Sequence, residues 1–176
     1  GSKAIKASLY RKTIMNQKGN ADRADGIAYT SNPQGSYEIS ITEGSRPYNT
    51  DKNKETCDFI QNARAAKDII NYVVAQEVLN KRPLPLYFRT YMIQVYEFRL
   101  RFYFMDYLGQ YRLFEIEKCE IPTDWREVSL FTSFYKSIVT WAENRERKSS
   151  RLSNSHNVRK LLNLAHNNER GGQNVI

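Results

Sequence analysis

Apolar residues along this chain are spaced in two ways, with the three- and four-residue steps of helices and the alternation of strands. The longest helical pattern runs from about Lys52 to Asn80 and has an apolar face broad enough to lie on a sheet. Pro83 and Pro85 end it, because proline cannot continue a helix. The apolar positions of this predicted helix are Phe59, Ile60, Ala63, Ala66, Ile69, Ile70, Val73, Val74 and Val78.

Two strands that form a hairpin are predicted before this helix, at Ala24–Thr30 and Tyr37–Glu43. The residues between them, Ser31–Ser36, are a dense cluster of turn formers. Upstream of the hairpin, the spacing in Lys3–Asn16 suits one face of a short helix. The residues expected on the face of the second strand that the long helix covers are Tyr37, Ile39 and Ile41.

Three further strands are predicted at Leu86–Val95, Glu97–Asp106 and Gln110–Cys119, where β-branched and aromatic residues dominate. The middle strand alternates, so we expect one face to pack and the other to meet solvent or ligand. In the last strand, Leu113 and Ile116 cannot share a face in strict alternation, which predicts a bulge or burial on both sides. The two faces of the middle strand are Phe98, Leu100, Phe102 and Phe104, and Glu97, Arg99, Arg101 and Tyr103.

Helix-start residues at Pro122–Asp124 precede a strongly amphipathic pattern, which predicts a helix over Trp125–Arg147. A short helix is also predicted at Val158–Ala165, and the last ten residues have the composition of a disordered segment. We therefore expect an α/β fold with a mixed central sheet of about five strands flanked by helices. Residues 3–148 would form this domain and residues 149–176 a basic, largely flexible tail.

Composition excludes several classes of protein. A chain of 176 residues has room for one sizeable core, and the first two residues resemble the remnant of a cleaved tag on a longer protein. No apolar run is long enough to span a membrane and no secretory leader is visible, so we expect an intracellular protein. Cys57 and Cys119 lack the spacing of a zinc site. His156 and His166, the only histidines, lie in the tail, which argues against histidine-based catalysis in the core.

Basic residues outnumber acidic ones by 27 to 19, which gives a net charge of +8 and favours polyanionic partners, nucleic acid above all. The alternative is that much of this excess belongs to a solvated tail. Arg99 and Arg101 share a strand face, with Arg89 and Arg112 expected nearby, and together they could contact phosphates. They could equally form ion pairs across the sheet. The acidic residues available for such pairs are Glu97, Glu115 and Glu117.

Carboxylates in and beside the hairpin are the candidates for chemistry. Asp25 begins the first strand, and Glu38 and Glu43 lie on the second. Strand alternation puts Glu43 and Ser45 on one face and Glu38 on the other, so the register decides which glutamate meets Asp25. Two such carboxylates can share Mg²⁺ or Mn²⁺, which activates water for attack on a phosphodiester. The alternative is that these acids belong only to a turn and a strand end.

Two segments carry a likeness to a known family: RADGI at residues 23–27 and EGSRP at residues 43–47, followed by a long helix and more strands. This arrangement resembles the PD-(D/E)xK, or restriction-endonuclease-like, nuclease superfamily, in particular a divergent fungal branch associated with mobile elements and Crinkler-type genes. The resemblance covers roughly residues 23–141. It implies that Asp25 is the first motif aspartate and Glu43 the second acid, with both as metal ligands. Ser45 occupies the lysine position, and Glu38-Ile39-Ser40 is an alternative placement that also has serine there.

The missing strand lysine leaves the catalytic cation to be found elsewhere. Lys54 and Lys67 lie on the following helix, where several families relocate this cation, although a helix lysine is more often a solvated surface group. Lys67 completes the expected catalytic set of Asp25, Glu43, Glu38 and Ser45, and Arg46 joins Arg99, Arg101 and Arg112 as a candidate for nucleic-acid contact.

The resemblance implies a nucleic-acid-binding, nuclease-like domain, intracellular and nuclear, with weak or lost metal-dependent phosphodiester hydrolysis. The alternative is a non-enzymatic domain of a larger intracellular protein that binds a partner protein or a second copy of itself. No membrane partner is expected.

Overall fold

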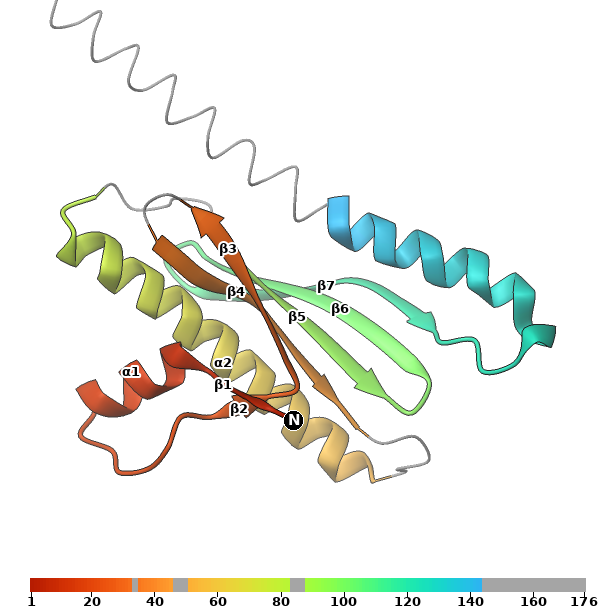
Figure 1. Ribbon diagram of the computed structural model, residues 1–176, viewed down its shortest axis with the longest axis horizontal. Coiled ribbons are helices and arrows are strands. Elements are labelled where there is room, and N and C mark those ends of the chain that lie inside the picture. The colour runs from red at the N-terminus through yellow and green to blue at the C-terminus, as the bar shows by residue number, and fades with distance from the viewer. Residues whose placement is uncertain (33–34, 46–50, 83–87, 144–176) are drawn as a thin grey trace, which may run out of the picture. The chain divides into compact units, whose positions relative to one another are not determined.

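The structure is a computed structural model that describes residues 1–32, 35–45, 51–82 and 88–143 (Figure 1). The chain divides into two compact units, Gly1–Trp141 and Ala142–Ile176, where the sequence predicted a division at residues 148 and 149. Of the second unit only residues 142 and 143 are described. The predicted tail, the short helix at Val158–Ala165 and Arg46 lie outside the described residues.

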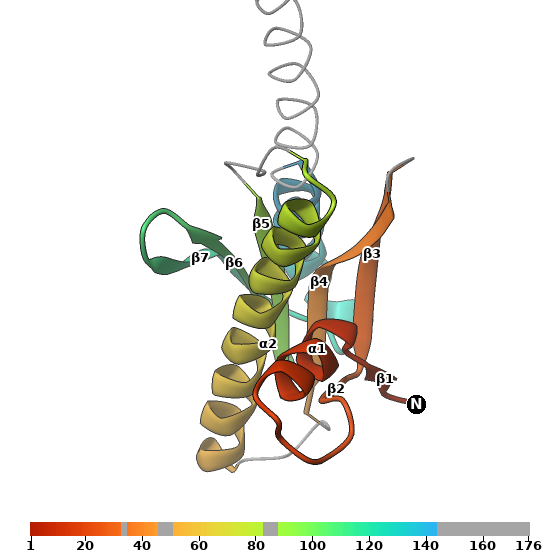
Figure 2. The same ribbon diagram turned by 90° about the vertical axis from the view of Figure 1, so that its left-hand side faces the viewer.

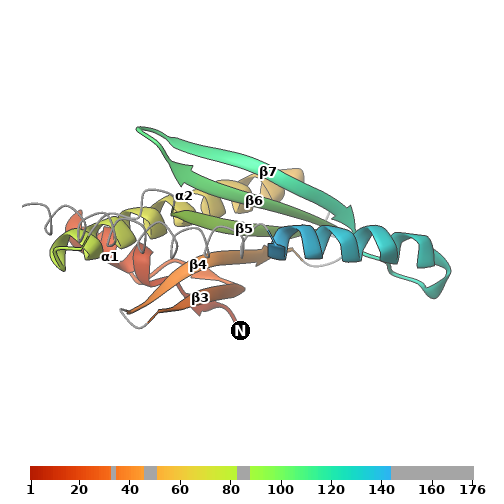
Figure 3. The same ribbon diagram turned by 90° about the horizontal axis from the view of Figure 1, so that it is seen from above.

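A five-stranded mixed sheet forms the centre of the first unit and confirms the predicted α/β fold. Its strands follow one another in chain order across the sheet (Figure 3). The pair β4 and β5 is parallel, whereas the other three pairs are antiparallel. The strands are β3 (Gly26–Asn32), β4 (Gly35–Gly44), β5 (Arg89–Tyr96), β6 (Arg99–Tyr107) and β7 (Tyr111–Glu120).

The long helix α2 (Lys52–Leu79) agrees with the prediction to within one residue and connects the parallel strands β4 and β5. Its N-cap is Asp51, whose carboxylate accepts hydrogen bonds from the backbone N–H groups of Asn53 and Lys54. The apolar face of α2 packs on β4, β5 and β6, where Ile41 and Ile69 are fully buried. Within the described part of the chain, no helix is both long and apolar enough to cross a membrane.

The N-terminal segment packs against the same side of the sheet as α2. The helix α1 (Lys6–Ile14) lies beside α2 (Figure 2). A two-residue strand before it, β1 (Lys3–Ala4), pairs with β2 (Arg23–Ala24), which leads directly into β3. The predicted first strand, Ala24–Thr30, is therefore divided into β2 and β3, with Asp25 in the bend between them.

Two β-bulges decide which residues face the core. In β7, Phe102 pairs with Glu117 and Tyr103 with Glu115, so Ile116 has no partner and the predicted bulge is confirmed. A second bulge, in β4, leaves Ile39 without a partner on β3. Tyr37 and Ile41 pack with the core, but Ile39 is absent from it. The expected shared face of these three residues is therefore wrong at Ile39, because the bulge interrupts the alternation.

A third helical segment follows β7, with a 3₁₀ turn at Trp125–Glu127 and an α-helix over residues 128–143, where the described residues end. Trp141 of this helix packs its ring against the rings of Tyr91 and Phe102, at centroid distances of 6.3 and 5.8 Å. On the opposite face of β6, Tyr103 is buried 5.3 Å from the ring of Phe59. The expectation that one face of the middle strand would meet solvent or ligand is thus wrong for its central residues, since both faces are packed.

Replacement of Ile41 by alanine tests the packing of α2 on β4. We expect the substitution to lower the free energy of unfolding by about 2 to 4 kcal/mol, because a fully buried side chain is truncated. Urea denaturation gives this value directly. The control is Ile60→Ala on α2, where the same change is made to a side chain that is 52% exposed. Equal losses for the two variants would contradict the assigned core.

Candidate functional site

A row of polar residues crosses one end of the sheet beneath the first turns of α2. Asp25 immediately precedes β3, and Glu43, Gln94 and Arg101 follow on the next three strands, where register pairs Glu43 with Gln94 and Gln94 with Arg101. Two residues from Glu43, Gln94 and Arg101 toward the centre of the sheet, on the same face, the side chains are buried and apolar or aromatic. These core neighbours are Ile41, Met92 and Tyr103. The core therefore gives way to a polar site within one step of the strand repeat.

Asp25 is fixed at this end of the sheet by its own side chain. Its Oδ2 accepts a hydrogen bond of 2.9 Å from the backbone N–H of Gly44, the residue after Glu43. On the other side, the amide of Gln61 on α2 donates to the carbonyl of Arg23 at 3.3 Å. The bend that carries Asp25 is thus held between β4 and α2. Of the two glutamates on β4, Glu43 is the one that neighbours Asp25.

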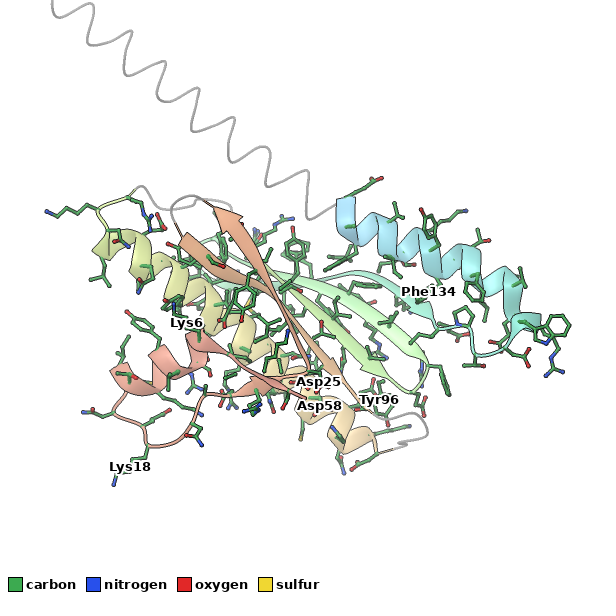
Figure 4. All side chains as sticks on the ribbon, in the orientation of Figure 1. Lys6, Lys18, Asp25, Asp58, Tyr96 and Phe134 are labelled. Atoms are coloured by element: carbon green, nitrogen blue, oxygen red, sulfur yellow. The ribbon has the colours of Figure 1, made fainter. Side chains whose placement is uncertain are left out.

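Helix α2 brings a cation and a further acid to the same place. Lys54 Nζ lies 2.5 Å from Asp58 Oδ2, one helical turn away. The same oxygen accepts a hydrogen bond of 3.1 Å from Ser45 Oγ, the side chain expected from the sequence at the lysine position of the PD-(D/E)xK motif. Figure 4 labels Asp25 and Asp58 at the same end of the sheet. A helix lysine therefore supplies positive charge where the strand has none.

Negative charge outweighs positive charge in this cluster. Burial raises the pKa of Glu43 to about 7, and the charges of Asp25 and Asp58 add to the rise, opposed only by Lys54. The pKa of Lys54 is raised in turn, first by its hydrogen bond to Asp58 and then by the surrounding carboxylates. Further positive charge beside this half-buried carboxylate would lower its pKa and favour the ionised form.

The donor set fits a hard divalent cation. Asp25 and Glu43 offer carboxylate oxygens on adjacent segments, and an ion between them would relieve the repulsion that raises the pKa of Glu43. Among the residues that the structure describes, no group of three or more His, Cys, Asp or Glu side chains is arranged to hold a metal. Mg²⁺ and Mn²⁺ suit such a site, because one or two carboxylates, with water and phosphate oxygens, satisfy Mg²⁺.

Glu38, the alternative second acid, has a different environment. Its side chain is 3% exposed, and its two oxygens accept hydrogen bonds from the backbone N–H groups of Lys6 and Ala7, at 2.7 and 3.1 Å. These groups belong to the first turn of α1, which has no side-chain cap at Ile5. Glu38 therefore caps a helix that is distant in sequence, and the placement of the motif at Glu38-Ile39-Ser40 is not supported.

Lys67 is not part of the cluster, contrary to expectation. It lies nine residues after Asp58, which is roughly two and a half helical turns, so it projects from the opposite side of α2. Its Nζ lies 5.0 Å from the centre of the Tyr111 ring on β7. Lys54 precedes Asp58 by four residues and shares its side of the helix. The rotation of α2 thus selects Lys54 over Lys67.

Four of the arginines proposed for nucleic-acid contact lie in the described part of the chain, and each of the four has an acidic partner. Arg99 lies 2.5 Å from Glu97, and Arg101 lies 3.4 Å from Glu55 on α2. Arg112 makes two hydrogen bonds to Asp106, of 2.9 and 3.1 Å. Arg89 approaches the same carboxylate at 3.5 Å. The structure thus shows the ion pairing that the sequence offered as the alternative. Of the acids expected to form these pairs, Glu97, Glu115 and Glu117, only Glu97 is among the partners found in the described residues. Only Arg101 belongs to the polar row.

Sequence reasoning missed Asp58 and Gln94. The spacing of Lys54 and Asp58, four residues apart on the predicted helix, was a usable signal for an ion pair on one helix face. Gln94 is a polar residue in the mostly apolar strand β5. Its place beside Glu43 depends on parallel pairing, which only the folded chain reveals.

Comparisons with protein-family models, with curated proteins and with solved structures find no match to this chain.

The raised pKa of Glu43 predicts a pH dependence of stability in the metal-free protein. Its pKa rises from 4.5 to about 7 on folding, so the native state holds a proton that the unfolded state has released between these values. We expect the free energy of unfolding, measured in EDTA, to fall as pH rises from 5 to about 7 and then to level off. Glu43→Gln should remove this component. Glu120→Gln, at an exposed position on β7, is the control, and a pH profile unaltered by Glu43→Gln would contradict the assignment.

Proposed function

We propose that this chain is a nucleic-acid-binding, nuclease-like domain of the PD-(D/E)xK kind, with slow hydrolysis of phosphodiesters that depends on Mg²⁺ or Mn²⁺. The observation that carries the proposal is the juxtaposition of Asp25 and Glu43 at one end of the sheet, with Lys54 in the same charge cluster. The hairpin is followed by the long helix α2 and by further strands, which is the order of elements on which the resemblance to the superfamily rests.

In this proposal Asp25 and Glu43 hold the cation, which when bound would supply an activated water and neutralise phosphate charge. The ammonium group of Lys54 takes the role of the strand lysine and offsets the charge that develops on the phosphate. Asp58 holds Lys54 in place at 2.5 Å, and Ser45 orients Asp58. Because Asp58 partly neutralises Lys54, the lysine offsets less charge on the phosphate, which favours a slow reaction.

The chain's charge supports a polyanionic substrate. A net charge of +8 favours DNA or RNA through release of counterions, without preference for sequence. Arg101 lies two strands from Glu43 in the polar row and could exchange Glu55 for a phosphate. An intracellular, nuclear location is part of this proposal, since the substrate is found there.

A second candidate function is the binding of a partner protein or of another copy of the chain, without catalysis. Its support is a set of exposed apolar side chains on the segment that follows β7. Each of them is more than half exposed, and their spacing of three and four residues puts them near one face of the helical segment. They are Trp125, Val128, Phe131 and Tyr135.

Cleavage assays with labelled single- and double-stranded DNA and RNA test the first candidate. We expect slow cleavage that requires a divalent ion, is faster in Mn²⁺ than in Mg²⁺, and is lost in Asp25→Asn and Glu43→Gln because each removes a charged ligand. Lys54→Met should lower the rate by about 10² to 10³-fold, since an electrostatic partner of the transition state is removed. Cleavage that survives Asp25→Asn would place the chemistry elsewhere.

Matched controls exist for each substitution. Lys67→Met removes the other helix lysine and should leave the rate unchanged. Glu38→Gln makes the same change as Glu43→Gln on the same strand, and should lower stability but not rate, because Glu38 caps α1. Ser45→Lys places the cation at the motif position and should restore activity to Lys54→Met. No restoration in a folded double variant would count against the motif geometry.

Binding can be measured separately by fluorescence anisotropy in the Asp25→Asn background, which prevents cleavage. We expect an affinity that falls steeply with salt and is insensitive to sequence. Arg99→Ala combined with Arg101→Ala should reduce the salt slope by about 1.4 to 1.8, the value for two phosphate contacts. Arg112→Ala is the control, because the partner of Arg112, Asp106, lies on the opposite face of β6 from Arg99 and Arg101. If removal of residues 149–176 abolishes binding and the double substitution changes nothing, the sheet is not the binding surface.

A further inference from the structure

Gln94 has a buried oxygen that is left without a partner. The residue is 3% exposed on β5, and its Nε2 donates a hydrogen bond of 2.9 Å to the backbone carbonyl of Glu55 in the first turn of α2. Because a carbonyl only accepts, this bond fixes which end of the side-chain amide carries the N–H groups. The other end, Oε1, is buried and accepts no hydrogen bond. Such an atom in a native protein calls for a ligand, a water or an ion.

The unpaired oxygen belongs to the residue that neighbours Glu43 across the sheet. Gln94 pairs with Glu43 across the parallel strands β4 and β5, so both side chains project toward the same face of the sheet. Its amide is held at Glu55, three residues before Asp58, whose carboxylate contacts Ser45. The oxygen is therefore enclosed by the elements that carry Glu43 and Asp58.

The chemistry of the other unpaired atoms sets Gln94 apart. Among the described residues, buried atoms without a hydrogen-bond partner also occur at Asn62, Thr90 and Tyr96. The Asn62 atom is Nδ2, a donor that cannot bind a cation. Thr90 lies on β5 four residues before Gln94, where it pairs with Met105 of β6, and so it is away from the polar row. The Tyr96 atom is a hydroxyl, whereas a side-chain amide oxygen is an established ligand of hard cations.

We propose that Gln94 Oε1 is the third protein oxygen of the cation site formed by Asp25 and Glu43. This inference rests on the proposed function for the first two ligands and adds a residue outside the resemblance to the nuclease motif. The site then consists of two carboxylates from the hairpin and one neutral amide from the strand that α2 connects to it. Water and a phosphate oxygen of the substrate complete the coordination.

Isothermal titration of the full chain with MnCl₂, without nucleic acid, tests the proposal apart from catalysis. We expect Gln94→Met, which keeps the length of the side chain but removes the oxygen, to weaken Mn²⁺ binding by at least about 10-fold. Gln94→Glu retains an oxygen and adds a charge, so it should bind Mn²⁺ at least as tightly as the unaltered protein. Thr90→Val is the control, since it deletes another unpaired buried oxygen from the same strand and should leave Mn²⁺ affinity unchanged.

Several results would overturn the proposal: unaltered Mn²⁺ affinity in Gln94→Met, an equal loss in Thr90→Val, or no binding by the unaltered chain at millimolar Mn²⁺. Circular dichroism and urea midpoints establish that each variant is folded. If Gln94→Met does not fold, the Mn²⁺ affinity of Gln94→Glu is compared with that of the unaltered protein instead. Mn²⁺ binding that depends on Gln94, without cleavage of any substrate, would refute the nuclease and leave the metal site intact. Mn²⁺-dependent cleavage that is unaffected by Gln94→Met would support the nuclease and refute Gln94 as a metal ligand.

Discussion

The parallel pairing of β4 with β5 is the constraint on which the rest of the structure depends. Parallel neighbours cannot be joined by a tight turn, so the chain must cross over the sheet between them, and α2 makes that crossing. The helix begins above the strand ends where Glu43 and Gln94 lie, and its apolar face then covers the centre of the sheet. The crossover by α2 thus produces both the core and a polar end of the sheet that Lys54 and Asp58 cover.

The contrast between this polar end and the adjacent core has an energetic meaning. Ile41 and Met92 are completely buried, and two residues after them come Glu43 and Gln94. The Glu43 carboxylate is desolvated and repelled by neighbouring acids, and the Gln94 amide oxygen has no hydrogen-bond partner. Unpaired and repelling groups cost stability, and such costs concentrate where a ligand is bound. The exposed ion pair of Arg126 with Asp124, by comparison, contributes little to stability.

Local patterns in the sequence were sufficient for most of the elements. The limits of α2 followed from apolar periodicity and prolines, and the bulge in β7 from two apolar residues whose separation is odd. A hairpin is a short-range structure, so the sequence could indicate that Asp25 meets a glutamate of the second strand, but the choice of Glu43 over Glu38 depended on the register. The choice between Lys54 and Lys67 was wrong because it depends on the rotation of α2 about its axis, which packing sets. The bulge at Ile39 and the helix-capping role of Glu38 likewise depend on contacts between distant segments.

The cap that Glu38 provides also bears on the order in which the chain folds. A nine-residue helix is too short to be stable alone in water, and α1 has no local side chain that satisfies its first N–H groups. Those groups find their acceptor only after β4 is formed, 31 and 32 residues further along the chain. The helix α1 is thus completed only after β4, although the ribosome synthesises it earlier than β4, and a nascent chain that stops before β4 would leave its first N–H groups without an acceptor.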